Sequence, residues 1–305
     1  MTATSSPSIV GSTAQFPFRS IDQPRICACL AVACALGLGA SAPGNAAPAF
    51  HVRVFHFVDR SRTIRLPNGS HVARPLVTVV RYPAQGGRHP LIVFAHGFAL
   101  TPAAYARLLR AWADAGFVVA APIFPLENAN APGGPTESDL VNEPRDISVV
   151  IDRLLHSELA AEIDPAKIAV AGHSDGAVAA LAVAYDERFR DRRIRAAIVM
   201  SGAALPGMGP FPRRGPPLLA MQGTADPINA PANTAGYFRT AGRPKFLLWL
   251  IGASHRPPYT DEEPDLGIVE DTTIAFLDHY LNRGSLRAFD AAAHRPTLAR
   301  LVADP

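Results

Sequence analysis

The sequence predicts an α/β fold with a mostly parallel, eight-stranded sheet flanked by helices. Two observations lead to this prediction. From Phe50 onward, short runs rich in Val, Ile and Phe alternate with longer segments of helical period. Several of the short runs are apolar nearly throughout, which is typical of strands covered on both faces of a parallel sheet.

Eight runs have the length and composition of strands: Val52–Phe57, Leu76–Arg81, Leu91–Ala95, Val118–Pro122, Ile168–Ala171, Ala196–Ser201, Pro217–Gln222 and Lys245–Ile251. Five segments are predicted helices: Pro102–Ala115, Pro144–Ser157, Gly176–Tyr185, Asn229–Ala241 and Asp271–Asn282. In the second of these, apolar side chains recur on one face, as expected for a helix that packs against a sheet.

The connections indicate one domain over residues 47–305, because no internal repeat or interdomain linker interrupts them. The loop from Leu126 to Asn142 follows the carboxyl end of a strand, where open α/β sheets bind ligands. Between Ser201 and Pro217 the chain has too few residues for a helical cap, so we expect no large cap domain. The role of the alanine-rich tail after Leu286 stays open.

Residues 1–46 have the pattern of a secretory signal peptide. Arg19 and Arg25 precede the apolar stretch from Ile26 to Ala40, and small residues follow it up to the expected cleavage site near Ala46. The stretch is short for a membrane span, which needs about 20 residues. We therefore expect export and no stable membrane insertion after processing. An uncleaved anchor and a lipoprotein acylated at Cys34 are the alternatives.

Composition restricts cofactors and partners. All three cysteines, Cys27, Cys29 and Cys34, lie in the signal segment, so the processed chain would have no thiol chemistry. The net charge of +3 comes from scattered residues without a basic run, so nucleic acid is not an expected partner. Neither clustered metal ligands nor a glycine-rich phosphate loop is visible, so we expect no metal and no cofactor. The oligomeric state stays open.

The segment IAVAGHSDGAV places Ser174 between two glycines, at the point where an apolar strand run stops and a helical run begins. The pattern Gly-x-Ser-x-Gly alone is weak evidence, since it arises by chance in roughly one chain in ten of this length. Its context is the strand, sharp turn and helix of a nucleophile elbow. The hydroxyl would then lie at a helix N-terminus, whose dipole favours developing negative charge.

A serine nucleophile requires a histidine base and an acid that orients the base. In this architecture they follow in the order serine, acid, histidine, each at the carboxyl end of a later strand. The segment GTADP supplies Asp226 after one strand, and GASH supplies His255 after the next. The rival acids follow the histidine and end no strand, so we interpret them as a solvated loop: Asp261, Glu262 and Glu263.

Four motifs in this order, FAHGF (Phe94 to Phe98), GHSDG, GTADP and GASH, resemble the α/β-hydrolase superfamily. The chain is similar to the group of dienelactone-hydrolase-like enzymes, platelet-activating-factor acetylhydrolases and cutinase-type polyester hydrolases. The resemblance implies the α/β-hydrolase fold, with Ser174 as nucleophile, His255 as base and Asp226 as its partner. It also implies an oxyanion hole made by the backbone N–H groups of Phe98 and Asp175.

Asp175 departs from the family pattern, which more often has an apolar or neutral residue after the serine. Its side chain either turns away to make a local hydrogen bond or faces the pocket and selects substrates with a cationic group. The Phe98 ring is either an apolar wall beside the scissile ester or a packed core aromatic. His96 and His173 are expected to hold loops by hydrogen bonds.

These inferences predict a secreted serine hydrolase that cleaves carboxylic esters through an acyl-enzyme. An open site without a cap suits short-chain esters or exposed polymeric esters. An amidase or a lactonase with the same residues is an alternative, and so is a catalytically silent fold that serves as a binding protein. The acyl and alcohol groups of the substrate stay open.

Overall fold

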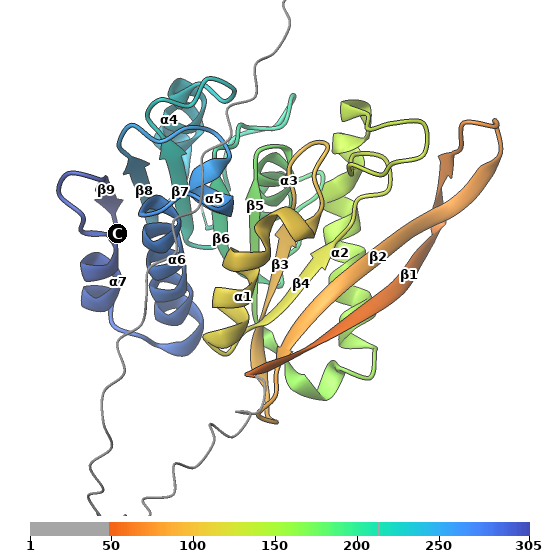
Figure 1. The fold of residues 1–305 in the computed structure, drawn as a ribbon, viewed down its shortest axis with the longest axis horizontal. Helices are drawn as coiled ribbons and strands as arrows, with labels where there is room; N and C mark the ends of the chain where they lie inside the picture. The colour runs from red at the N-terminus through yellow and green to blue at the C-terminus, as the bar shows by residue number, and fades with distance from the viewer. Residues whose placement is uncertain (1–48, 213) are drawn as a thin grey trace, which may run out of the picture. The chain divides into compact units, whose positions relative to one another are not determined.

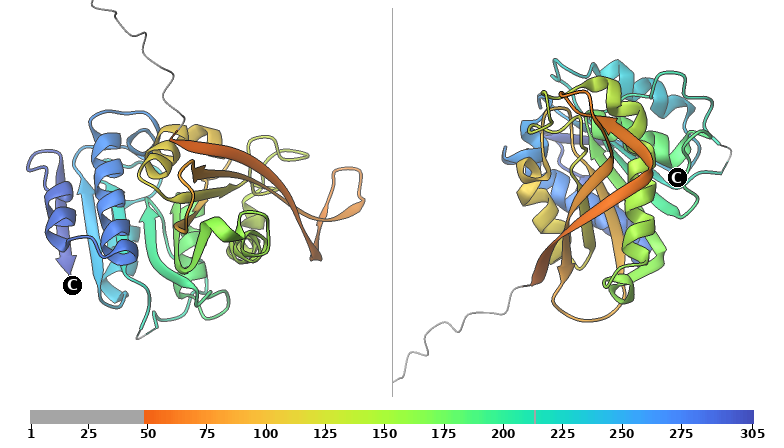
Figure 2. Two further views of the ribbon diagram at one scale, coloured as in Figure 1. Left: turned by 90° about the horizontal axis from the view of Figure 1, so that it is seen from below. Right: turned by 90° about the vertical axis from the view of Figure 1, so that its right-hand side faces the viewer.

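The computed structural model describes residues 49–212 and 214–305. The predicted signal peptide, its cleavage site and the three cysteines lie outside the described residues. In the described part, one sheet lies between two layers of helices (Figure 1), and Figure 2 shows helices on both sides of the sheet.

The sheet contains nine strands in the order β1-β2-β4-β3-β5-β6-β7-β8-β9. The neighbours from β4 through to β8 run parallel, whereas β1 with β2, β2 with β4, and β8 with β9 are antiparallel. All eight predicted strands are present, and the predicted number was one too low because β9 lies in the tail. The bounds are β1 Phe50–Arg65, β2 His71–Pro83, β3 His89–Ala95, β4 Val118–Pro122, β5 Ile163–His173, β6 Ile194–Met200, β7 Leu218–Gly223, β8 Lys245–Leu250 and β9 Ala299–Asp304.

All five predicted helices form, with boundaries that shift by a few residues. The largest shift is in α6, which begins six residues before its predicted start, directly after Pro264. The α-helices are α1 Ala106–Asp114, α2 Glu143–Leu155, α3 Asp175–Tyr185, α4 Pro231–Thr240, α5 Pro257–Thr260, α6 Asp265–Asn282 and α7 Leu286–Ala293. Three short 3₁₀ helices are η1 Pro102–Tyr105, η2 Glu137–Asn142 and η3 Ala160–Glu162.

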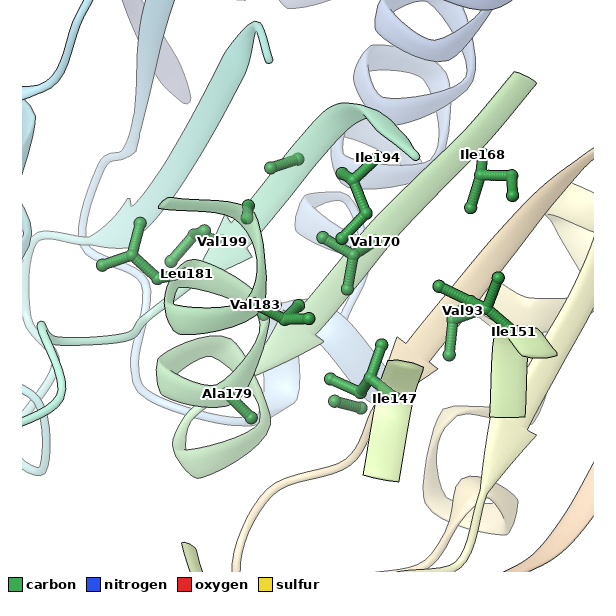
Figure 3. Packing of buried hydrophobic residues seen from close by; sticks show 14 of the residues in the cluster. Val93, Ile147, Ile151, Ile168, Val170, Ala179, Leu181, Val183, Ile194 and Val199 are labelled. Atoms are coloured by element: carbon green, nitrogen blue, oxygen red, sulfur yellow. The ribbon is translucent and has the colours of Figure 1, made fainter. Parts of the chain in front are cut away.

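Each face of the sheet has its own hydrophobic core, because successive side chains of a strand point to opposite faces. Val93 and Val170 pack with α2, α3 and α4, whereas Ala169 and Ala171 pack with α1, α6 and α7. Figure 3 shows side chains of α2 and α3, among them Ile147, directed toward the strands on the first face. Strands covered on both faces account for the continuous apolar runs in the sequence.

The tail after Leu286 completes one end of the sheet. β9 pairs antiparallel with β8, and α7 places Phe289 against the rings of Phe246 and Phe276, with ring centroids 4.9 and 5.7 Å apart. The side chain of Phe289 is almost fully buried. The tail therefore covers an otherwise exposed strand edge.

The carboxyl edge of the sheet carries the loops after β5, β7 and β8, which contain Ser174, Asp226 and His255. In the described residues between Ser201 and Pro217 the chain forms no helix, in agreement with the expectation that no large cap covers this edge. In the part of the chain that the structure describes, no helix combines the length and the apolar character needed to cross a membrane.

Candidate active site

Ser174 stands in the sharp turn between β5 and α3, with φ of 56° and ψ of −122°. This positive φ is unusual for a residue with a side chain and is held by close packing on both sides. A Cβ on Gly172 would lie 2.1 Å from the Gly176 oxygen, and one on Gly176 would lie 2.2 Å from the Ala95 oxygen. Only glycine fits these two positions, which explains the flanking glycines of the elbow.

The structure brings together the three side chains predicted from their order in the sequence. The Ser174 hydroxyl lies 2.9 Å from Nε2 of His255, and Nδ1 of His255 lies 2.8 Å from Oδ2 of Asp226. Because a carboxylate only accepts hydrogen bonds, Nδ1 carries the proton and Nε2 is free to accept from the hydroxyl. The serine belongs to the turn after β5, the aspartate to the loop after β7 and the histidine to the loop after β8.

The Asp226 carboxylate is held as an anion. Oδ1 accepts from the backbone N–H groups of Ile228 and Asn229, both at 2.9 Å, and Oδ2 also accepts from the Gln222 amide at 3.0 Å. Burial alone would raise the pKa of Asp226, but the hydrogen bonds from His255 and from these two N–H groups outweigh burial and lower the pKa. The ordering acid therefore stays charged at neutral pH.

His173 fixes the position of His255 through its backbone. Its Nε2–H donates to the His255 carbonyl at 2.9 Å, and its Nδ1 accepts from the Tyr105 hydroxyl at 2.8 Å. That hydroxyl also accepts from the N–H of Gly97 at 3.2 Å. Burial lowers the pKa of His173 to about 3, so the ring is neutral and serves as a link between two loops.

The sequence analysis expected His173 to hold loops by hydrogen bonds, which agrees with these contacts, but it missed Tyr105. Tyr105 lies in η1, where the sequence shows only an amphipathic helical pattern. His96 has the expected structural part too: Nδ1–H donates to the Gly97 carbonyl at 2.9 Å, and Nε2 accepts from the Phe124 N–H at 3.1 Å.

The two backbone N–H groups predicted for an oxyanion hole have no partner among the described residues. Asp175 is the first residue of α3, so its N–H lies in the first turn, where no intrahelical acceptor exists. The N–H of Phe98 belongs to the turn after β3, and the next residue, Ala99, has a positive φ of 54°. The Ala99 N–H donates to the Glu127 carbonyl at 2.8 Å and so ties this turn to the loop after β4.

A cavity of about 450 Å³ opens beside Ser174 and His255. Its apolar lining comes from Phe98, Leu100, Pro227, Ile228 and Pro257. Phe98 is half-buried and contributes to this lining, in agreement with the interpretation as a pocket wall. Ile228 is 73% exposed, which is unusual for an isoleucine and places an apolar surface directly at the cavity mouth.

Charged side chains line the same cavity: Glu137, Asp175 and Arg256. The Asp175 carboxylate makes no hydrogen bond to any described residue, so the interpretation that it turns away to a local partner finds no support. Burial, reinforced by the charge of Glu137, raises the pKa of Asp175, and the nearby His255 opposes this rise. Asp175 thus contributes to the lining of the cavity beside Ser174.

The rival acids lie elsewhere. Asp261 accepts from the Thr260 hydroxyl at 2.7 Å, Glu263 pairs with Arg107, and Glu262 makes no hydrogen bond to His255.

Among residues 49–212 and 214–305, no group of three or more His, Cys, Asp or Glu side chains is placed to hold a metal ion. A larger cavity of about 660 Å³ between the β6–β7 connection and α4 contains none of the predicted site residues.

A serine on a strained elbow at the carboxyl edge of this sheet, linked to a histidine and an aspartate from two later loops, defines an α/β-hydrolase of the serine-hydrolase type. The chain belongs to the chlorophyllase family, whose family model matches residues 52–236. The matched region includes Ser174 and Asp226 and ends before His255.

Two individual proteins are similar to the chain. Chlorophyllase-2 of Arabidopsis thaliana is 26% identical over 148 residues, which are 48% of this chain and 45% of the relative, so the match spans less than half of either protein. A ferulic acid esterase from Streptomyces cinnamoneus has the same fold, with a TM-score of 0.63 and 20% identity over 81% of this chain and 94% of that one. These findings confirm the predicted class, an α/β-hydrolase of the esterase type.

Proposed function

We propose that the protein hydrolyses carboxylic esters through an acyl-enzyme on Ser174. The observation that carries the proposal is the unbroken chain of hydrogen bonds from the Ser174 hydroxyl through His255 to Asp226, at 2.9 and 2.8 Å. Membership in the chlorophyllase family supports an ester as the substrate, and so does the structural neighbour, which is by name an esterase.

In acylation, Ser174 Oγ attacks the ester carbonyl carbon and its proton passes to Nε2 of His255. The carbonyl electron pair moves onto oxygen, where the N–H groups of Phe98 and Asp175 are proposed to stabilise it; one such donor is worth about 3 kcal/mol. When the intermediate collapses, the alcohol leaves with the proton from His255. Water then attacks the acyl carbon, gives a proton to His255, and the acid departs as Ser174 regains its proton.

The test is hydrolysis of a p-nitrophenyl ester series from acetate to palmitate. We expect turnover that falls with acyl length, because the cavity is open, and a loss in kcat on the order of 10⁶-fold in Ser174→Ala. Ser254→Ala is the matched control, since Ser254 lines the same cavity without a partner in this hydrogen-bonded chain. A preference for long chains would contradict the open short-ester site. A silent binding protein would show neither turnover nor labelling by a fluorophosphonate.

The carboxylates of Asp175 and Glu137 are proposed to set the charge preference of the site. They line the same cavity as Ser174, so a substrate with a cationic group is favoured over one with an anionic group. Asp175→Asn should lower kcat/KM for amino-bearing esters relative to neutral esters of the same length. An unchanged ratio in Asp175→Asn and in Glu137→Gln would exclude this selection.

Residues 1–46 are proposed to direct export. The support is the sequence pattern alone, with Arg19 and Arg25 before the apolar stretch and small residues before Ala46. Expression of the full chain in a secreting bacterium, followed by intact mass measurement of the exported protein, should give a start near Ala47. A mass that includes Met1, or a lipid on Cys34, would support one of the two alternatives instead.

A further inference from the structure

Two fully buried carboxyl groups, one in the loop after β4 and one at the start of α2, have no cationic partner among the described residues. Glu127 follows β4 and Glu143 is the first residue of α2, and both side chains are completely inaccessible to solvent. None of their four carboxyl oxygens accepts a hydrogen bond from a donor among the described residues. The two carboxyl groups lie close enough for each to shift the pKa of the other. Buried polar groups without a partner are rare and require an explanation.

The nearby cations are already neutralised. Arg74 of β2 is buried and donates to Asp139 and Asp146, and Arg62 of β1 donates to Asp146 and Asp59. Two arginines thus face three aspartates, which leaves no positive charge for the glutamates. The other charged groups that act most strongly on the pair are also carboxylates: Glu137, Asp139, Asp146 and Asp175.

We propose that Glu143 retains a proton at neutral pH and donates it in a hydrogen bond to Glu127, and that this acid pair positions the turn carrying the Phe98 N–H. Two adjacent anions without a counter-ion would be strongly unfavourable at this depth, whereas a shared proton supplies the missing donor. The positioning part rests on the proposed function, because it concerns the oxyanion hole of that reaction.

The pair acts on the site through the backbone of its own loop. The Glu127 carbonyl accepts from the Ala99 N–H at 2.8 Å, and two residues later the Ala129 N–H donates to the Leu100 carbonyl at 3.2 Å. These two bonds clamp the residues directly after Phe98. The side chain of Glu127 ties the clamp to the start of α2, so Glu127 and Glu143 are positioning residues.

The direction of titration agrees with this arrangement. Burial and the neighbouring carboxylates raise the pKa of Glu143 well above its ordinary value, whereas for Glu127 the hydrogen bond from Glu143 opposes the rise in pKa that burial causes. The folded protein therefore binds more protons here than the unfolded chain. Its free energy of unfolding loses this contribution as pH rises above the ordinary glutamate pKa of 4.5 and into the alkaline range.

The first experiment is isotope-edited infrared spectroscopy of the whole protein at pH 7. We expect a protonated carboxyl band in the wild type that is absent from Glu143→Gln and unaffected by the control Glu187→Gln, which changes an exposed glutamate. No difference between wild type and Glu143→Gln would overturn the shared proton. This readout does not depend on ester hydrolysis, so it stands apart from the proposed function.

The second experiment compares pH profiles of kcat and KM for a short p-nitrophenyl ester. The wild type should lose kcat reversibly at alkaline pH, where Glu143 gives up the shared proton, with little change in KM. Glu143→Gln should keep kcat at pH 7 and lose the alkaline fall, because its amide still donates and cannot ionise. Glu143→Met removes the donor and should lower kcat about 10- to 100-fold, as expected for a misplaced catalytic group.

An alkaline fall that is the same in wild type and Glu143→Gln would overturn the positioning role. If Glu143→Met does not fold, the infrared band and the wild-type and Glu143→Gln profiles still decide the matter. Absence of any turnover, with no fluorophosphonate label on Ser174, would instead count against the proposed function.

Discussion

At the scale of single residues, the candidate site depends on more than three side chains. His255 is oriented by Asp226 through Nδ1, while its backbone carbonyl accepts from His173, whose ring also lies 4.8 Å from the His255 ring. A histidine held on two sides keeps its Nε2 directed at Ser174 without cost at the moment of reaction. Substitutions of the residues that hold His255 in place should therefore change kcat measurably.

Removing the charge of Asp226 should separate orientation from binding. Asp226→Asn keeps the size of the side chain but disfavours the tautomer with a proton on Nδ1, so we expect kcat to fall by about 10⁴-fold with a small change in KM. Steady-state kinetics with a p-nitrophenyl ester measures this. Glu262→Gln is the control from the loop after the histidine. A larger loss of kcat in Glu262→Gln than in Asp226→Asn would show that Asp226 is not the acid that orients His255.

Tyr105→Phe tests the link between the Gly97 turn and His173. The change leaves the Gly97 N–H and the His173 Nδ1 buried without their partner, which costs about 1–3 kcal/mol of unfolding free energy. We expect kcat to fall as well, because His173 holds the backbone of His255. Urea unfolding and kinetics are compared with Tyr280→Phe, whose hydroxyl makes no hydrogen bond to a described residue. Equal effects in both variants would remove the special role of Tyr105.

At the scale of elements, the elbow is possible only because β3, β5 and α3 approach without side chains between them. Gly172 contacts the first turn of α3, and Gly176 contacts the end of β3. The elbow residue Ser174 donates its N–H to the Met200 carbonyl of β6 at 3.0 Å. Three strands and one helix thus determine the backbone conformation of a single residue.

Gly176→Ala should disrupt this packing, since the new Cβ would lie 2.2 Å from the Ala95 oxygen. We expect a loss of about 3 kcal/mol or more in unfolding free energy, at the upper end of overpacking effects. Gly236→Ala in α4 is the matched control, because its Cβ meets no atom within 4 Å and should stabilise the helix by about 0.5–1 kcal/mol. Thermal unfolding of both variants measures the contrast, and an unchanged melting temperature in Gly176→Ala would contradict it.

At the scale of the whole described domain, the tail is part of the sheet and of the core beneath α6. The Ile251 N–H, just before the loop of His255, donates to the Leu298 carbonyl at 2.8 Å, and Arg243 pairs with Asp304 at 2.6 Å. The sheet edge, the tail and the loop that carries His255 are therefore continuous. We expect them to unfold together.

Phe289→Ala tests this continuity, because the ring is 1% exposed and fills the space between α6 and β8. The cavity should cost about 3–5 kcal/mol, a large part of the 5–15 kcal/mol that typically holds a domain folded. Urea unfolding followed by both fluorescence and activity should show one coincident transition at lower urea. Leu286→Ala, at an exposed leucine of the same helix, should change stability by less than about 0.5 kcal/mol. Separate transitions would mean that the tail unfolds by itself.

The sequence by itself determined the α/β class, the eight strands from β1 to β8, and the order in which Ser174, Asp226 and His255 follow their strands. These features are local: apolar runs and helical period report burial, and the flanking glycines report a crowded turn. Carboxyl ends of parallel strands meet at one edge, so their order along the chain already predicts that the three side chains meet.

Only the tertiary structure decided which surfaces the remaining residues face. The tail became β9 because it meets the free edge of β8, and Tyr105 reached His173 across 68 positions of sequence. Among the described residues, Asp175 lines the cavity without a local hydrogen-bond partner, and Glu127 lies near Glu143 without a cation. None of these features produces a periodic pattern in the sequence, because each depends on how the chain packs in three dimensions. A single polar residue in the sequence also does not indicate whether its side chain is solvated or buried.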